Sequence, residues 1–141
     1  MSSGTIRFHF DVDGEDFSSA GAASVEVKKN LRQLGFAPDV IRRVAIAMYE
    51  GEINMVIHAD GGTVDVEVYP DYILMVLSDR GPGIENVELA MQEGFSTARD
   101  NIRSLGFGAG MGLPNMKKYT DSMEIETKVG YGTKVIMKVN V

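Results

Sequence analysis

The sequence contains no cysteine and no tryptophan, and its 141 residues include only two histidines and four prolines. The absence of cysteine excludes disulfides, thiolate nucleophiles and cysteine zinc sites. The two histidines, His9 and His58, are too few for a zinc site built from histidines. No apolar run approaches the roughly 18 residues that a membrane-spanning helix needs, and residues 1–10 carry no apolar segment of signal-peptide length. We therefore expect a cytoplasmic protein.

The composition is that of an ordinary globular chain, with 44% hydrophobic and 24% charged residues. The length of 141 residues suits one domain, so we expect residues 1–141 to form a single unit that needs no disulfide or metal to fold. The net charge of −6 disfavours nucleic acid as an electrostatic partner. Neither a nucleic acid nor a membrane is expected as a partner.

Hydrophobic periodicity predicts the order strand, helix, helix, strand, strand, long loop, helix, strand, strand. The strands are expected at residues 5–12, 63–69, 72–78, 122–127 and 133–139, and the helices at about residues 19–34, 38–58 and 113–119. The glycine-rich residues 79–111 form the loop, with a short helix near residues 87–91.

Local signals also mark the ends of the first two helices. Ser18 or Ser19 is the expected cap of the first helix, Gly35 its stop, and Pro38 the start of the second helix. The order of elements predicts an α+β fold. We expect a two-layer sandwich with the helices on one face of a mainly antiparallel mixed sheet.

Glu50, Asn54 and His58 recur every four residues on the second predicted helix. This spacing places them in one stripe, about 6 Å apart along the helix axis. Two interpretations remain open: a solvated polar face, or a general base one turn away from an oxygen ligand for Mg²⁺. Gly51 lies beside this stripe, costs about 1 kcal/mol relative to alanine, and has no explanation in the sequence.

Two glycine clusters follow. Asp79 ends an apolar strand and precedes Gly81-Pro82-Gly83-Ile84, which forms either a plain turn or a site for a planar ligand whose exocyclic amine donates to the carboxylate. Residues 106–115 read Gly-Phe-Gly-Ala-Gly-Met-Gly-Leu-Pro-Asn. They form either a flexible linker or a cradle of backbone N–H groups for an anion. The spacing is that of neither a P-loop nor a dinucleotide fingerprint.

Together and in this order, the clusters resemble three motifs of the GHKL (histidine-kinase-like, Bergerat) ATP-binding fold. The matching patterns are Glu50-x-x-x-Asn54 for the N box, Asp79-x-Gly81-x-Gly83 for the G1 box and Gly108-x-Gly110-x-Gly112 for the G2 box. Gly130-Tyr131-Gly132-Thr133 resembles the last motif of the family. The resemblance covers about residues 39–141, and the segments 93–98 and 110–114 resemble RsbT-type switch kinases more than RsbW or SpoIIAB. The chain departs from the family pattern at Gly51, Glu52 and the glycine pair Gly106 and Gly108.

The resemblance implies an anti-sigma regulatory protein serine/threonine kinase that uses ATP and Mg²⁺. Glu50 would be the catalytic base and Asn54 the ligand of Mg²⁺. Asp79 would bind the adenine amino group with support from Thr133. The other implied nucleotide-binding residues are Gly81, Gly83, Ile84, Gly108, Gly110, Met111, Gly112 and Leu113, with a lid at about residues 94–110.

The implied substrate is a STAS-domain antagonist protein in a partner-switching pathway. The alternative is a nucleotide-gated module that binds a sigma factor or another regulator and has little or no kinase activity. The basic residues of the first two helices either face an acidic partner or are simply solvated; they are Lys28, Lys29, Arg32, Arg42 and Arg43. The predicted edge strand at residues 6–12 would allow a homodimer.

Overall fold

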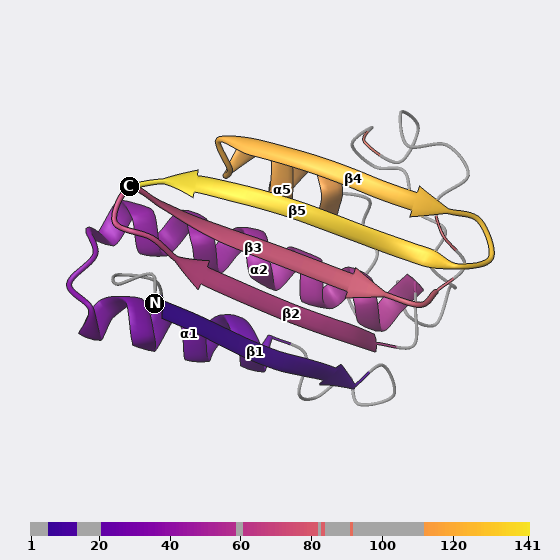
Figure 1. Ribbon diagram of the computed structural model, residues 1–141, viewed down its shortest axis with the longest axis horizontal. Helices are drawn as coiled ribbons and strands as arrows, with labels where there is room; N and C mark the ends of the chain where they lie inside the picture. The colour runs from indigo at the N-terminus through magenta and orange to yellow at the C-terminus, as the bar shows by residue number, and fades with distance from the viewer. Residues whose placement is uncertain (1–5, 14–20, 59–60, 82, 84–90, 92–111) are drawn as a thin grey trace.

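The computed structural model describes residues 6–13, 21–58, 61–81, 83, 91 and 112–141, which form two layers (Figure 1). One layer is a five-stranded sheet in the order β1-β2-β3-β5-β4. Its strands are β1 (Ile6–Asp13), β2 (Gly61–Val68), β3 (Tyr72–Asp79), β4 (Ser122–Lys128) and β5 (Gly132–Asn140). The other layer consists of the helices α1 (Ala22–Gln33), α2 (Pro38–His58) and α5 (Gly112–Lys118).

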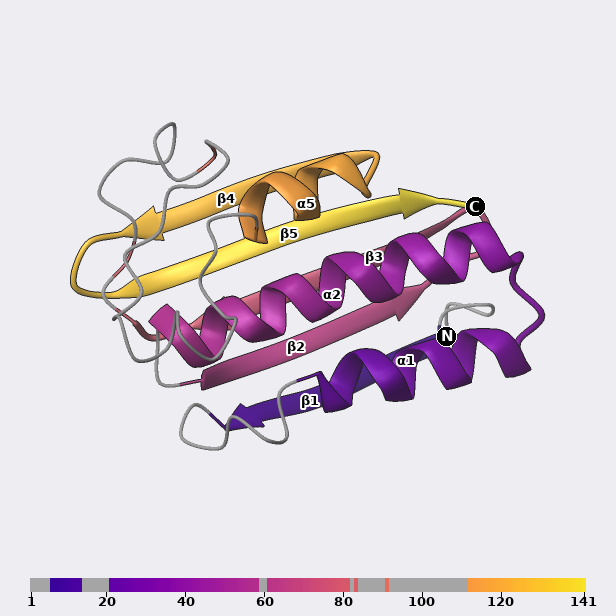
Figure 2. The ribbon, with the colours of Figure 1, turned by 180° about the vertical axis from the view of Figure 1, so that it is seen from behind.

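All three helices cover the same face of the sheet. Seen from the helix side, α1 lies over β1, α2 over the central strands, and α5 over β5 and β4 (Figure 2). The predicted α+β sandwich and the predicted order of elements are therefore confirmed. None of the helices in the described part of the chain combines the length and apolar character needed to cross a membrane.

The sheet differs from the expectation of a mixed sheet, because every pairing among the described strands is antiparallel. Two pairs of strands are hairpins, β2 with β3 and β4 with β5. Between β1 and β2 the chain makes two helical passes, which return it to the end where β1 finished. Strand β2 therefore starts at the end where β1 finished and runs antiparallel to it.

The core lies between the sheet and the helices. Val64, Val66 and Val68 of β2 all face the helices and are buried, as their alternation predicts. The helices contribute buried residues at helical spacing, namely Val27, Leu31, Val40, Val44, Ala47 and Met48. The side chains on the other face of β2 are only half-buried, because no described helix covers that face.

Helix α2 begins at Pro38, and Gly35 follows the end of α1 with a φ of 84°, both as predicted. The start of α1 differs from the prediction, since the helix begins at Ala22 rather than near residue 19. Its N-cap residue, Gly21, supplies no side-chain hydrogen bond. The expected capping serines lie outside the described residues.

The first turn of α1 is instead capped by Glu52 of α2. Oε2 of Glu52 accepts hydrogen bonds from the N–H groups of Gly21 at 3.0 Å and Ala23 at 3.2 Å, and Oε1 accepts one from Ser24 at 2.7 Å. Burial raises the pKa of Glu52, and these backbone donors lower it in part. A local sequence pattern does not reveal this cap, because the acceptor comes from another helix.

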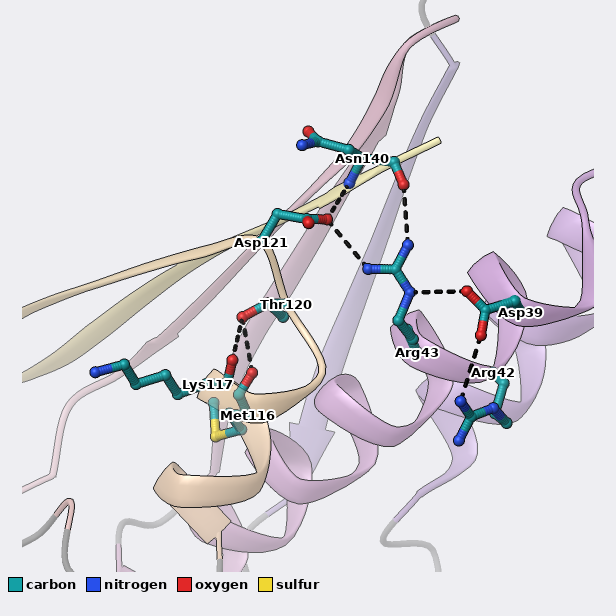
Figure 3. Close-up of polar contacts among 8 residues, drawn as sticks. All are labelled: Asp39, Arg42, Arg43, Met116, Lys117, Thr120, Asp121 and Asn140. Atoms are coloured by element: carbon teal, nitrogen blue, oxygen red, sulfur yellow. Dashed lines mark hydrogen bonds and ion pairs between the residues drawn. The ribbon is translucent and has the colours of Figure 1, made fainter.

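At the far end of the molecule, Arg43 joins α2 to the ends of two strands (Figure 3). Its guanidinium donates to Asp39 and Asp121, each at 3.2 Å, and to the carbonyl oxygen of Asn140 at 3.2 Å. Asp121 also accepts the N–H of Asn140 at 2.6 Å, and this bond, followed by Arg43, lowers the pKa of Asp121. Arg43 is thus committed to an internal contact and is not part of a free basic surface.

Gly51 is explained by close packing of α2 on the sheet. A Cβ at this position would lie 2.1 Å from Cδ2 of Leu77 on β3 and 3.3 Å from Cε of Met116 on α5. Leu77 and Met116 are both buried, so neither side chain moves away freely. The glycine is needed for this approach.

We expect Gly51→Ala to lower the free energy of unfolding by about 1 kcal/mol, because overpacking costs about 2 kcal/mol and the gain in helix propensity returns about 1 kcal/mol. Chemical denaturation measures the change. In a Leu77→Val background, which shortens the side chain by one methylene and withdraws its methyl groups from the point of contact, the same substitution becomes neutral or stabilising. An equal loss in both backgrounds would show that Leu77 is not what requires the glycine.

Candidate functional site

Those sequence-predicted site residues that the structure describes lie toward one end of the two layers. There the carboxyl end of β3 lies beside the start of β5, under the last turns of α2 (Figure 1). Helix α5 lies beside α2 on the same face of the sheet and contacts it, and the start of α5 is turned toward this end (Figure 2).

The two carboxylate oxygens of Asp79 differ in their hydrogen bonds to the described residues. Oδ1 accepts the N–H of Gly81 at 2.9 Å and the N–H of Thr133 at 3.2 Å. No described residue donates to Oδ2. The first oxygen fixes the turn after β3 and the start of β5, and the second remains available to accept from a ligand amine.

Two glycines bring neighbouring strands unusually close to the end of β3. A Cβ on Gly62 of β2 would lie 2.1 Å from the carbonyl oxygen of Ser78, and one on Gly132 of β5 would lie 2.2 Å from that of Asp79. In both places the contact is with backbone, which has little freedom to move. The packing role of Gly62 is visible only through its pairing with Asp79 on the neighbouring strand.

Thr133 lies beside Asp79, as the resemblance implies. Its backbone N–H donates to Asp79, and its hydroxyl lies 2.9 Å from the hydroxyl of Thr127 on β4.

Gly83 packs against the turn between β4 and β5, since a Cβ there would lie 2.5 Å from the carbonyl oxygen of Lys128. Gly83 therefore has a demonstrated packing contact, and its implied contact with a nucleotide stays a prediction.

Glu50 and Asn54 point toward α5 and are half-buried, which is unlike a fully solvated polar face. Burial raises the pKa of Glu50, and a hydrogen bond with Asn115 lowers it by a smaller amount. Nδ2 of Asn54 lies 3.8 Å from Sδ of Met116, a long and weak contact. The structure thus brings together the two predicted residues and adds Asn115. The sequence pattern assigns this residue, at the end of the second glycine cluster, no role. The side chain of His58 is not among those described.

Several predicted residues lie outside the part of the chain that the structure describes. They are Ile84, Gly108, Gly110, Met111 and the lid at residues 94–110, together with most of the short helix expected at residues 87–91. Gly112 and Leu113 open α5, and Leu113 packs against the core. Their roles toward a nucleotide stay predictions.

Among the described residues, the predicted ligand of Mg²⁺ is the side chain of Asn54. They contain no group of three or more acidic or histidine side chains that could hold a metal ion. Mg²⁺ is commonly held by one or two protein oxygens together with substrate phosphates, so a single amide oxygen on Asn54 suits that mode.

The chain belongs to the family of histidine kinase-like ATPase domains, whose model matches residues 15–139. Among curated relatives, the chain is 33% identical over 122 residues to the anti-sigma F factor of Clostridium beijerinckii, with 82% of each chain covered. It is 29% identical over 108 residues to the serine/threonine-protein kinase RsbT of Bacillus subtilis, covering 74% of this chain and 75% of RsbT. The curated relatives therefore include both a protein named as an anti-sigma factor and a protein named as a serine/threonine kinase.

Solved structures agree on the fold. A crystal structure of the RsbU and RsbW domains of a Mycobacterium tuberculosis protein has a TM-score of 0.65 at 16% identity, over 95% of this chain and 32% of that chain. The mycobacterial sensor histidine kinase MprB has a TM-score of 0.53 at 17% identity, over 96% and 97% of the two chains. At such identities the likeness concerns the fold alone.

We expect Asp79→Asn to weaken ADP binding at least tenfold, measured by titration calorimetry. An asparagine that keeps its oxygen on the two N–H groups would turn its amide nitrogen toward the ligand amine, so a donor would face a donor. The loss of one hydrogen bond to a charged group is worth about 1.5–3 kcal/mol. Asp71→Asn, in the exposed turn at the other end of β3, is the matched control. Unchanged affinity of the folded Asp79 variant would rule out its role in adenine recognition.

Proposed function

We propose that this chain is a protein serine/threonine kinase that transfers a phosphoryl group from Mg²⁺–ATP to a STAS-domain antagonist protein. The observation that carries the proposal is the placement of Glu50. It is a half-buried carboxylate with a raised pKa, it lies one helical turn from Asn54, and its neighbour Gly51 packs on Leu77, two residues before Asp79 on β3. The similarity to RsbT supports the same assignment.

Each residue of the site has a distinct role in the proposal. Asp79 accepts from the adenine amino group, and Thr133 is held beside it by the bond from its own N–H. Asn54 offers its side-chain oxygen to Mg²⁺, which neutralises phosphate charge when bound. The remaining nucleotide contacts come from Gly81, Gly83, Ile84, Gly108, Gly110, Met111, Gly112 and Leu113.

Glu50 acts as the general base. The hydroxyl proton of the substrate serine or threonine passes to its carboxylate as the oxygen attacks the terminal phosphorus, while the bond from that phosphorus to the bridging oxygen breaks and ADP leaves. Only the ionised carboxylate accepts this proton. Because burial raises the pKa of Glu50, the transfer rate should increase with pH through a range above the ordinary value for glutamate.

A second candidate function is a nucleotide-gated binding module. The naming of relatives at 33% and 35% identity as anti-sigma F factors favours it. In this version the same residues bind ATP, and the bound nucleotide changes the affinity for a sigma factor without phosphoryl transfer. The expected cytoplasmic location suits both functions.

Intact-mass spectrometry distinguishes the two functions. The protein is mixed with Mg²⁺–ATP and the STAS-domain protein encoded nearest to it in the genome. The kinase proposal predicts one added phosphoryl group on the partner, which Glu50→Gln or Glu50→Ala reduces at least a hundredfold while ADP affinity stays within about threefold of wild type. A wild-type transfer rate in these variants would exclude Glu50 as the base. A stable, nucleotide-dependent complex with no mass change would favour the binding module.

We also propose that two copies pair through β1, which is an edge strand of the sheet. Its exposed face carries the basic side chains of Arg7 and His9 in one half, followed by the acidic Asp11. An antiparallel pair that sets Arg7 against Asp11 of a second copy also sets Phe8 against Phe10, and it sets His9, which is bonded to Asp65 of its own chain, against His9.

Sedimentation velocity tests the pairing. We expect the wild type to dimerise at tens of micromolar and Asp11→Lys to stay monomeric, because the new lysine would oppose Arg7 of the second copy. Glu124→Lys, the same change of charge on the other edge strand, should leave the dimer intact. Equal behaviour of the two variants would exclude the β1 interface.

A further inference from the structure

Glu52 is a buried carboxylate that the proposed reaction does not use. Its exposed fraction is 1%, and it lies on α2 two residues after Glu50 and two before Asn54. At 100° per residue, Glu52 projects from the opposite side of the helix to both. Glu50 and Asn54 serve the site, whereas Glu52 reaches across to α1.

The contact with α1 is unusually complete. Three N–H donors at the start of the helix meet the two oxygens of Glu52, at 2.7–3.2 Å; they belong to Gly21, Ala23 and Ser24. The first turn of α1 contains no acidic residue of its own and no side-chain cap. The dipole of α1 and the orphan donors of its first turn are therefore both matched by a charge on α2.

Neighbouring contacts hold the same turn of α2 tightly. Gly21 lies against the ring of Tyr49, where an added Cβ would come within 2.9 Å of Cε1. Gly51, on a third side of α2, packs against Leu77 of β3. Because a helical turn moves as a unit, a displacement that carries Glu50 and Asn54 also carries Glu52, and with it the first turn of α1.

From this geometry we infer that Glu52 is a positioning residue, which couples the nucleotide site on α2 to the first turn of α1. The inference rests on the proposed function only in requiring that nucleotide binds at Glu50 and Asn54. Bound nucleotide fixes the turn of α2, and Glu52 transmits this restraint to α1, whose outer surface is exposed at Val25, Lys28 and Lys29. The surface of α1 then differs between the nucleotide-bound and free protein.

Amide hydrogen exchange with and without saturating Mg²⁺–ADP tests the coupling. In the wild type, we expect nucleotide to slow exchange at Ala23, Ser24 and Val25 at least fivefold. Glu52→Gln keeps the volume but lacks the charge and one acceptor. The variant should bind ADP with an affinity within about threefold of that of the wild type. The decrease in the logarithm of the exchange rate at α1 on adding nucleotide should be less than half of the decrease in the wild type.

A control variant separates coupling from simple loss of stability. Val27→Ala removes buried methyl groups from α1 and speeds exchange without touching Glu52, so its response to nucleotide should remain. If Glu52→Gln does not fold, Glu52→Asp serves instead, since it keeps the charge but does not reach all three donors, and an intermediate response is expected. In transfer assays, Glu52→Gln should lower kcat about tenfold and leave the KM for ATP unchanged.

The outcomes are distinguishable. If wild-type protein binds no nucleotide by calorimetry, both the proposed function and this inference fail. If wild type and Glu52→Gln bind nucleotide and slow exchange at α1 equally, the inference alone is overturned. The inference is also overturned if Val27→Ala loses the response to the same extent as Glu52→Gln, because the effect would then report stability.

Discussion

The structure depends most on one turn of α2, in which three consecutive residues meet three different elements. Glu50 faces Asn115 of α5, Gly51 packs on Leu77 of β3, and Glu52 caps α1. Successive side chains of a helix lie about 100° apart, so a single turn can make all three contacts. A buried carboxylate is stable only while its donors stay in place, which makes the contact with α1 the most demanding of the three. The position of the candidate base follows from that constraint.

The other half of the site is built by a single aspartate. Asp79 joins the turn after β3 to the start of β5 through one oxygen, and it presents the other at the same end of the molecule as Glu50. The glycines at positions 62 and 132 let both neighbouring strands approach the backbone around it. In the proposed site, the strands would thus set the nucleotide position, and the helices the reacting position. This division suits a reaction in which positioning supplies most of the catalysis.

The elements were predictable because their signals are local. Alternation in β2, the proline that opens α2 and the glycine that ends α1 each act within a few residues. The pairing of Asp79 with Thr133 was predictable only through the family motif. The cap of α1 by Glu52, the packing reason for Gly51 and the contact of Asn115 with Glu50 were not predictable. Each of them joins residues that are distant in the sequence, and no local pattern records which elements will be neighbours.

A crystal structure with Mg²⁺ and a non-hydrolysable ATP analogue tests whether Glu50, Asn54 and Asp79 form one nucleotide site. We expect the adenine amino group within about 3 Å of Oδ2 of Asp79, Mg²⁺ on the side-chain oxygen of Asn54, and Glu50 facing the terminal phosphate. A nucleotide seated elsewhere, or an adenine that leaves Oδ2 of Asp79 without a partner, would contradict this expectation.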